Sequence, residues 1–397
     1  MEQVDNFILR EARPDDIANI INLYYSAYEG AYPDKRFTQY PLLQKTIESS
    51  NCYIFVATKD EQLVSSILFQ YDDINLLSKA GAAVVSPECR GNNLTQSLIK
   101  FGIEFLNKNT QGIEVLYITT RTVNRAAQVL TQKLGFKKLG IFPNVHKTTE
   151  YETHALAAYY SENAFEKRYV DFNQHPRVKP FFDIVKKECE LPEQKFAESW
   201  NQKNYEGKVP KLEVIEAPEF VKYRISKLKE ENEIDLGFFP FHEPSHLITS
   251  PDQNIEVFAY ISDVDKYCVI TGVKIDREVS FNDLFLKISN ILRDRGVRYI
   301  EMIIRANRLN IIEKIMNSKF IPCGYFPAFQ LDEGKRFDYV VFSRSFEIFD
   351  FNNLELTGVN QNFLQEYVKM WEEISIGSKF IKAGLAAQKE SEGKKRD

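Results

Sequence analysis

The chain of 397 residues is poor in cysteine, histidine and tryptophan, and it has no long apolar run. The scattered cysteines form no CxxC pair, which argues against a disulfide framework and predicts reduced thiols. They are Cys52, Cys89, Cys189, Cys268 and Cys323. No apolar stretch approaches the roughly 18–20 residues that span a membrane, and residues 1–6 lack a signal-peptide layout. We therefore expect a cytoplasmic protein without membrane contacts.

An excess of positive charge is also missing, because the formal net charge is −5. This balance gives no support to a nucleic-acid partner. Hydrophobic residues make up 44% and charged residues 27% of the chain, as in globular proteins. The length suits two or three domains.

Residues 84–99 are the most informative stretch of the chain. They read as an apolar strand, a polar loop that contains Gly91, Asn92 and Asn93, and an amphipathic helix from Leu94. Glycine and asparagine tolerate left-handed backbone angles. A loop of this kind before a helix directs several backbone N–H groups at one point, where the helix dipole favours an anion such as a pyrophosphate. An ordinary strand-to-helix turn is the alternative.

The first 160 residues predict a mixed α/β layer in the order β-α-α-β-β-β-α-β-α-β-β. Alternating or β-branched segments predict strands, and apolar residues three or four apart predict helices. The expected strands are 7–13, 52–57, 63–71, 80–85, 115–120 and 153–160, and the expected helices include 94–107 and 125–134.

This order and two motifs resemble the GNAT superfamily of acyl-CoA N-acyltransferases, over roughly residues 6–160. Arg90 matches the first position of the family motif Q/R-x-x-G-x-G/A, and Asn93 and Thr95 stand at its glycine positions. Asn124, followed by Gly135-Phe136, matches a second family motif. The resemblance implies a mixed, mostly antiparallel sheet flanked by helices.

The resemblance also implies acetyl-CoA as co-substrate and transfer of its acetyl group to a primary amine. The loop amides would hold the pyrophosphate, Asn124 would lie near the pantetheine, and backbone N–H groups of the preceding strand would hold the oxyanion, with Val84 and Val85 foremost. The expected CoA-binding residues are Ala83, Val84, Val85, Arg90, Gly91, Asn92, Asn93, Leu94, Thr95 and Asn124.

The sequence offers few candidates for the general acid and the general base. The tyrosine that acts as general acid in the family would fall at Thr131, and the strand before the loop carries no acid. Asp72, Asp73 and Glu114 are the weak candidates for a base that acts through water.

The second half of the chain echoes the first in three places that keep their order. Glu11-Ala-Arg-Pro resembles Glu216-Ala-Pro, Asn51–Val56 resembles Asn254–Ala259, and Arg121…Gly140-Ile-Phe-Pro resembles Arg305…Gly324-Tyr-Phe-Pro. The interval between the last two echoes is shorter in the second half, in the part that contains the third strand and the phosphate loop. There, residues 269–275 run through an acidic turn, 276–280, straight into a helix, so we expect the phosphate loop to be missing. The fold is thus expected twice, with no CoA site in the second copy.

The expected division of the chain has four parts. Residues 1–160 form the acyl-CoA-binding domain, 161–211 a structured connector with helices near 185–190 and 194–200, 212–350 the degenerate copy, and 351–397 a helix at 361–374 with a charged tail from about 388. Arg336 and Asp338 are expected to form ion pairs between domains. The oligomeric state is left open.

Histidines and tyrosines supply the remaining candidates. His242-Glu-Pro-Ser-His246 fits HExxH, but Pro244 argues against the helix that zinc binding needs, so a loop at the substrate cleft and no metal are expected. His146 and His154 are expected to be core or surface residues, with a general base as the minor alternative. The tyrosine-rich segment 24–40 is expected to face the substrate, with packing on the core as the alternative.

The acceptor amine is expected to belong to a small molecule, because a second domain would close the cleft. Two other functions remain open. One is a non-catalytic CoA-ligand sensor or interaction protein on the same fold. The other is an aminoacyl or peptidyl transferase, which would not use CoA.

Overall fold

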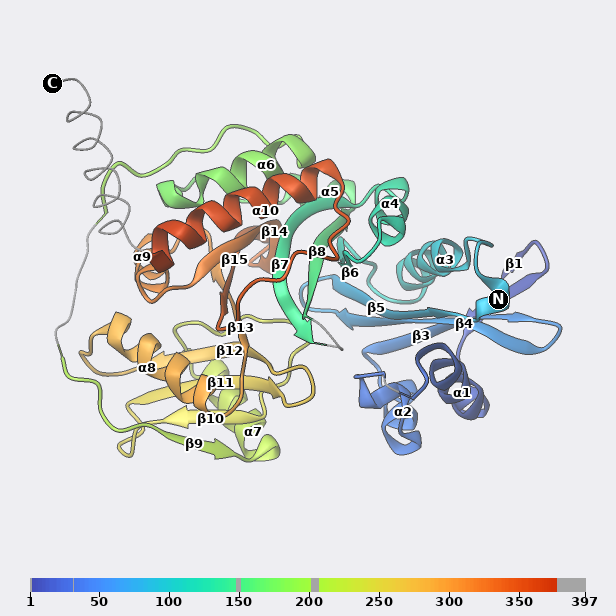
Figure 1. Ribbon diagram of the computed structural model, residues 1–397, viewed down its shortest axis with the longest axis horizontal. Coiled ribbons are helices and arrows are strands. Elements are labelled where there is room, and N and C mark those ends of the chain that lie inside the picture. Colours follow the sequence, from blue (N-terminus) through green and yellow to red (C-terminus); the bar gives the residue numbers. More distant parts are fainter. Residues whose placement is uncertain (1, 31, 148–150, 201–206, 377–397) are drawn as a thin grey trace, which may run out of the picture.

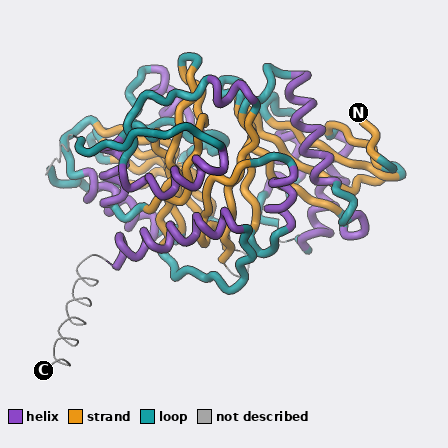
Figure 2. The backbone as a smooth tube through the Cα atoms, turned by 90° about the horizontal axis from the view of Figure 1, so that it is seen from above, coloured by secondary structure: helices purple, strands orange, loops and turns teal. Residues whose placement is uncertain are grey.

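A computed structural model describes residues 2–30, 32–147, 151–200 and 207–376. In these residues, fifteen strands join into one sheet in the order β1-β2-β3-β4-β5-β6-β8-β7-β14-β15-β13-β12-β11-β10-β9. Strands of the first half of the chain (residues 2–160) occupy one end of the sheet, and strands of the second half (residues 213–345) occupy the other (Figure 1). Figure 2 shows the strands running through the middle of the molecule between helices.

The first half follows the expected order of elements. Its strands are β1 (Glu2–Val4), β2 (Phe7–Glu11), β3 (Cys52–Lys59), β4 (Gln62–Asp72), β5 (Leu77–Val85), β6 (Val115–Arg121), β7 (Lys137–Lys147) and β8 (Tyr151–Tyr160). Its helices are α1 (Ile17–Tyr28), α2 (Tyr40–Ile47), α3 (Leu94–Asn109) and α4 (Ala126–Lys133). Pairing is antiparallel except between β5 and β6, so the predicted mixed, mostly antiparallel sheet is confirmed.

The two faces of the first half carry different helices. Phe55, Phe69 and Ala80 pack against α3, whereas Ile54, Val56 and Leu68 pack against α1 and α2. Adjacent strand residues point to opposite faces, and this alternation produces the division. Figure 1 shows α3 on one side of these strands and α1 with α2 on the other.

The second half has the same order of strands. They are β9 (Glu213–Glu216), β10 (His246–Thr249), β11 (Ile255–Ser262), β12 (Tyr267–Ile275), β13 (Tyr299–Arg305), β14 (Ile321–Asp332) and β15 (Lys335–Ser345). The helices are α7 (Pro218–Glu230), α8 (Phe281–Asp294) and α9 (Leu309–Asn317). Again one pair, β12 with β13, is parallel.

The position of each strand in the sheet corrects one of the three sequence echoes. Counted inward from β2, which lies next to the edge strand β1, and from the edge strand β9, β3 corresponds to β10 and β4 to β11. The echo between Asn51–Val56 and Asn254–Ala259 therefore matches β3 with β11, which is one strand out of step. The expected run of residues 269–275 into a helix is present as β12 and α8, and their connection is shorter than the loop from β5 to α3.

The halves meet between β7 and β14, where Gly140 pairs with Gly324. A Cβ atom on Gly140 would lie 2.6 Å from the carbonyl oxygen of Cys323 and 2.6 Å from the Cα of Gly324. One on Gly324 would lie 2.9 Å from the carbonyl oxygen of Leu139. Both glycines are therefore needed for the two backbones to approach this closely.

The connector and the C-terminal helix cover this joint. Helices α5 (Glu162–Glu166) and α6 (Lys179–Cys189) precede the second half, and α10 (Gly358–Trp371) follows it. Helix α6 packs on β7, β14 and α10 (Figure 1). Residues 194–200 do not form the expected helix, because the segment runs extended and Phe196 bridges to Gln174. The predicted charged tail lies outside the described residues.

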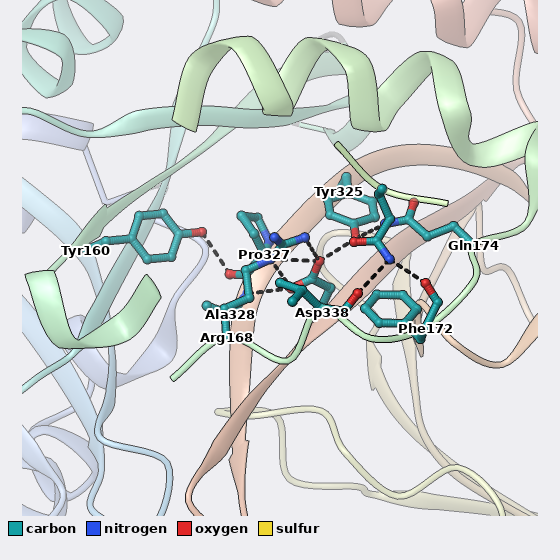
Figure 3. A network of polar contacts seen from close by, with 10 residues as sticks. Tyr160, Arg168, Phe172, Gln174, Tyr325, Pro327, Ala328 and Asp338 are labelled. Atoms are coloured by element: carbon teal, nitrogen blue, oxygen red, sulfur yellow. Dashed lines mark hydrogen bonds and ion pairs between the residues drawn. The ribbon is translucent and has the colours of Figure 1, made fainter. Parts of the chain in front are cut away.

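Buried ion pairs also tie the parts together. The guanidinium of Arg336 on β15 donates to Glu114 of the first half at 2.6 Å and to the carbonyl oxygen of Asn75 at 2.6 Å. Asp338 accepts from Arg168 of the connector and from the hydroxyl of Tyr325 (Figure 3). The expectation that Arg336 and Asp338 make structural ion pairs is confirmed.

Candidate functional site

The loop between β5 and α3 has the backbone that its sequence predicts. Gly91 has φ +88° and Asn93 has φ +54°, so asparagine takes the left-handed conformation at a glycine position of the motif. Asn93 is the N-cap residue of α3, but its side chain does not cap the helix. The backbone N–H groups of residues 91–95 donate to no described residue, and Arg90, Gly91, Asn92 and Asn93 are exposed. Such a helix start can accept an anion.

The parallel strands β5 and β6 separate just before this loop. Their pairing runs from Leu77 and Val115 to Ala80 and Ile118 and stops there, although both strands continue. On the other side of β5, the register with β4 shifts and Ala82 has φ +51°, which marks a β-bulge. The bulge turns β5 away from β6 and leaves a V-shaped opening beside Ala83, Val84 and Val85.

Helix α1 holds the bulge in place. Tyr24 is fully buried, and its hydroxyl donates to the carbonyl oxygen of Ala82 and lies 3.3 Å from the hydroxyl oxygen of Ser66. Phe37 is also fully buried and stacks on Tyr24 at 4.4 Å between ring centroids. Tyr24 and Phe37 therefore pack on the core, which was the alternative interpretation of the tyrosine-rich segment.

The three weak candidates for a base lie at the wrong end of their strands. Glu114 precedes β6, at the end remote from the opening, and is held by Lys167 and Arg336, which lower the pKa of its carboxyl although burial opposes them. Asp72 ends β4 and accepts from the backbone of the following turn, where Asp73 is exposed. These contacts make Glu114 and Asp72 structural residues.

Thr131 is also placed away from the opening. Its side chain is buried on the inner face of α4, where its hydroxyl donates to the carbonyl oxygen of Gln128 at 2.9 Å and accepts from Lys138 at 2.6 Å. A residue in these contacts cannot take over the proton delivery of the tyrosine. Asn124 lies at the end of β6, and its side-chain oxygen accepts from the N–H of Ala126 at the start of α4.

A cavity of about 120 Å³ lies between the two halves, on the face of the first half opposite α3. It begins at Lys79, Tyr117 and Thr119, where β5 and β6 separate. The second half closes it with Tyr267, Glu301 and several aromatic rings. The remaining lining residues are Phe142, Val145, His146, His154, Leu156, Phe239, His242, Ile303, Phe326, Phe329 and Val341.

Three histidines belong to this cavity. His146 Nδ1 lies 3.4 Å from Asp265 of the second half, and its ring lies 4.7 Å from that of His154. Burial lowers the pKa of His154 to about 4, so the ring is neutral at pH 7. His242 lies in a loop rather than a helix, and burial holds its pKa well below the usual value. The expectation of a loop at a cleft is confirmed for His242, whereas His246 belongs to β10 and lies 3.6 Å from Glu216.

Comparisons with known proteins identify the first half. Residues 17–136 match the family model described as "Acetyltransferase (GNAT) family". These residues belong to the GNAT acetyltransferase family. The first half is accordingly that of a GNAT N-acetyltransferase, an enzyme of the acyltransferase class. The family implies acyl-CoA as co-substrate and an amine as acceptor.

Solved structures of acetyltransferases resemble part of the GNAT chain. A "probable acetyltransferase" from Staphylococcus epidermidis ATCC 12228 is 19% identical, with a TM-score of 0.35, and the match covers 39% of this chain and 99% of that one. The ribosomal-protein-S18-alanine N-acetyltransferase of Escherichia coli is 20% identical (TM-score 0.34; 40% and 97% covered). The spermidine/spermine N-acetyltransferase of Vibrio cholerae is 18% identical (0.34; 40% and 98%). No curated protein sequence matches the chain significantly.

The corresponding opening in the second half of this GNAT chain is filled. Strands β12 and β13 pair only from Tyr267 to Val269, as β5 and β6 pair only at their start. The free edge of β12 is then taken by residues 235–236. The N–H of Val273 donates to the carbonyl oxygen of Leu236 at 2.8 Å, and the N–H groups of Asp235 and Leu236 donate back to Val273.

The helix start in the second half is also occupied. Ser280 accepts from the N–H of Asp283 and so caps α8, whereas Asn93 leaves α3 uncapped. The preceding residues include Asp276 and Glu278, which repel an anion. The absence of a CoA site in this half stays a prediction.

Sequence reasoning missed Lys79 and Glu301. Each is a charged residue inside an otherwise buried strand, Leu77-Ser-Lys-Ala in β5 and Tyr299-Ile-Glu-Met in β13. A lone charge in such a strand is a signal that could have found them, because charged residues are seldom buried unless paired.

In the described residues, no helix could cross a membrane. The same residues contain no group of three or more His, Cys, Asp or Glu arranged to hold a metal.

Proposed function

We propose that this GNAT enzyme transfers an acetyl group from acetyl-CoA to the primary amine of a small molecule. The first half would bind acetyl-CoA, and both halves would enclose the acceptor. The observation that carries this proposal is the position of the V-shaped opening. An uncapped helix start lies on one face of the sheet beside it, and a cavity with ionisable groups begins at its apex on the other face.

The loop and β5 supply the groups that acetyl-CoA requires. The free N–H groups of residues 91–95 suit a pyrophosphate. Pantetheine would lie along residues 83–85, with Asn124 at the opposite strand end, and backbone N–H groups of Val84 and Val85 would stabilise the oxyanion. A preorganised backbone donor at this position would supply transition-state stabilisation that water cannot.

The volume of the cavity favours a small acceptor. A cavity of about 120 Å³ is somewhat smaller than an engineered cavity of roughly 150 Å³ that holds benzene. A protein substrate would have to thread an end between the two halves, past Asp265 and the histidine-lined wall. We infer further that the second half is a degenerate copy of the same fold, which shapes the acceptor cavity and does not bind CoA.

Thermal unfolding with acetyl-CoA tests the proposal. Ligand at about 100 times its Kd adds about 2.7 kcal/mol to the unfolding free energy, so the unfolding temperature should rise clearly. Gly91→Trp fills the loop and Asn93→Asp adds a charge that repels the pyrophosphate, so each should abolish the rise. Glu278→Gln, at the equivalent place in the second half, is the matched control and should leave the rise intact.

Two results would contradict the proposal. Absence of any shift at millimolar acetyl-CoA would remove acyl-CoA as the ligand and favour an aminoacyl or peptidyl transferase. A normal shift, combined with no thiol release above hydrolysis from any member of a broad amine panel, would instead favour a CoA-ligand sensor.

A further inference from the structure

The cavity between the halves contains two opposite charges that are not paired with each other. Lys79 comes from β5 of the first half, and Glu301 comes from β13 of the second half. Counted along the two parallel strand pairs, both lie at the third paired position, Lys79 with Tyr117 and Glu301 with Val269. The two halves therefore each place one charge at the same depth, facing a shared space.

Lys79 is a cation without an anion. Its Nζ makes no ion pair or hydrogen bond with any residue in the described part of the chain, and its closest aromatic contact is the Tyr117 ring at 5.9 Å. Burial lowers the pKa of Lys79 to about 8, although Glu301 opposes the shift from a distance. A half-buried ammonium loses part of its hydration, and without a partner this loss is not compensated, so a bound anionic group would stabilise it.

Glu301 is a carboxylate with one partner. Its Oε2 accepts from the hydroxyl of Tyr267 at 3.1 Å, which leaves the rest of the carboxylate able to accept. Burial raises the pKa of Glu301 to about 7, against the opposing effects of Tyr267, Lys79 and His146. The titratable groups that face it from the packed elements are Lys79, Tyr117, His146, Tyr267, Tyr299 and Cys323.

We propose that the acceptor is a small free amino acid, whose carboxylate binds Lys79 and whose amine binds and gives a proton to Glu301. This inference rests on the proposed function and assigns its acceptor class. The apolar walls, which include Phe142, Phe326 and Phe329, would enclose a short side chain. A cavity of about 120 Å³ leaves no room for a large one.

The proposed reaction balances without a further reagent. The ammonium of the amino acid gives one proton to Glu301, and the freed lone pair forms the C–N bond to the thioester carbonyl carbon. The C–S bond then breaks, and its electron pair leaves with the sulfur. The second proton of the attacking nitrogen neutralises this thiolate, which gives CoA thiol, and Glu301 releases its proton to solvent. The products are the N-acetyl amino acid, CoA and one proton.

Matched acceptors test the carboxylate contact with the unmodified full-length protein. Glycine, L-alanine and L-serine are compared with glycinamide, L-alaninamide and L-serinamide, and with ethylamine, by thiol release from acetyl-CoA. A charge-assisted contact predicts that the best amino acid exceeds its amide about 10- to 100-fold in kcat/KM. L-Tryptophan should be a poor substrate. Equal kcat/KM for the acid and the amide would overturn the proposal.

Two substitutions separate the roles of the charges. Lys79→Met should raise KM for the amino acid about 10- to 100-fold and should remove the preference for the amino acid over its amide. Glu301→Gln keeps the volume and should lower kcat/KM for every amine about 100-fold or more. Lys138→Met and Glu256→Gln remove a buried lysine and a buried carboxylate outside the cavity, and they should leave the preference for the acid over the amide intact.

The pH profile distinguishes catalysis from a merely structural role. Glu301 accepts a proton only when ionised, so kcat/KM should fall as the pH drops through about 7. Lys79 binds a carboxylate only when protonated, so kcat/KM should also fall as the pH rises above about 8. Glu301→Gln should remove the acid limb, and Lys79→Met the alkaline limb. Unchanged limbs in both variants would assign the two residues to structure alone.

Acetyl-CoA binding, measured by thermal shift on the same samples, keeps the two proposals distinct. A normal shift with no thiol release from any of the amino acids would overturn the amino-acid assignment and leave acyl-CoA binding standing. A lost shift in the wild-type protein would remove the proposed function itself. The substrate panel needs no variant, so it remains decisive if Glu301→Gln fails to fold.

Discussion

The two halves share one order of strands from β2 and from β9 onward, but another segment pairs with the free edge between the parallel strands in only one of them. In the first half, the pairing of β5 with β6 stops before the bulge at Ala82, and the loop after β5 leads to an uncapped helix start. In the second half, residues 235–236 pair with the corresponding edge of β12, and Ser280 caps the helix. A few local hydrogen bonds thus distinguish the two halves at the place where we propose that acetyl-CoA binds.

The closed half is still part of the site. Glu301, Tyr267 and His242 line the cavity that begins at the opening of the first half. The backbone N–H and carbonyl groups of Val273 both form hydrogen bonds with residues 235–236, so this edge of β12 has no free backbone group at Val273. The comparison suggests that one half keeps the acyl-donor side while the other supplies groups to the acceptor side.

The joint between the halves gives the largest predicted effect. Gly140→Val would place side-chain atoms within 2.6 Å of the backbone of Cys323 and Gly324. Backbone atoms cannot move aside as a flexible side chain can, so we expect a loss of roughly 3 kcal/mol or more of unfolding free energy. Urea unfolding followed by circular dichroism measures it, and acetyl-CoA-dependent thiol release should fall with the loss of the shared cavity.

Gly358→Ala is the control for this substitution. No atom lies within 4 Å of the added Cβ, and the residue starts α10, so stability should change by about 1 kcal/mol or less, in the stabilising direction. If Gly140→Val were as stable as the wild-type protein, the two halves would not depend on this contact, and the comparison of an open and a closed half within one sheet would fail.

Local patterns predicted most elements of the first half, and geometry explains what they missed. The positive φ of Asn93 follows from its residue type, and the helix from Leu94 follows from its buried Leu98 and Phe101. The echo of Gly140 and Gly324 was detected, but a repeat in the sequence does not reveal that the two glycines touch each other. The echo between Asn51–Val56 and Asn254–Ala259 was one strand out of step because β3 and β11 have similar apolar strand sequences.

The cavity could not be derived from the sequence in the same way. Lys79 and Glu301 are 222 positions apart in the sequence. They line the same cavity because the pairing of β7 with β14 joins the strands of both halves into one sheet. Asp72, Asp73 and Glu114 were considered because they lie near the strands of the site in sequence. The structure places them at the opposite strand ends, a distinction that needs the direction of each strand in the sheet.

Hydrogen exchange compares the two openings directly. Acetyl-CoA at saturation should raise the protection of peptides that contain residues 81–85 by the equivalent of about 2–3 kcal/mol. The amide of Val273 already donates to Leu236, so its protection should be high without ligand and unchanged with it. Asn93→Asp, which we expect not to bind acetyl-CoA, is the control. Acetyl-CoA-dependent protection at Val273 would mean that the second half opens and binds as well.

The two helix starts give the smallest and most local comparison. Ser280→Ala removes the cap of α8 and should lower the unfolding free energy by about 1 kcal/mol. Asn93→Gly removes no cap, because the Asn93 side chain makes none, and glycine accepts φ +54° without strain. Urea unfolding without ligand should therefore show a change of a few tenths of a kcal/mol at most for Asn93→Gly. An equal loss in both variants would mean that α3 is capped in solution, and its free N–H groups would then no longer distinguish the first half from the second.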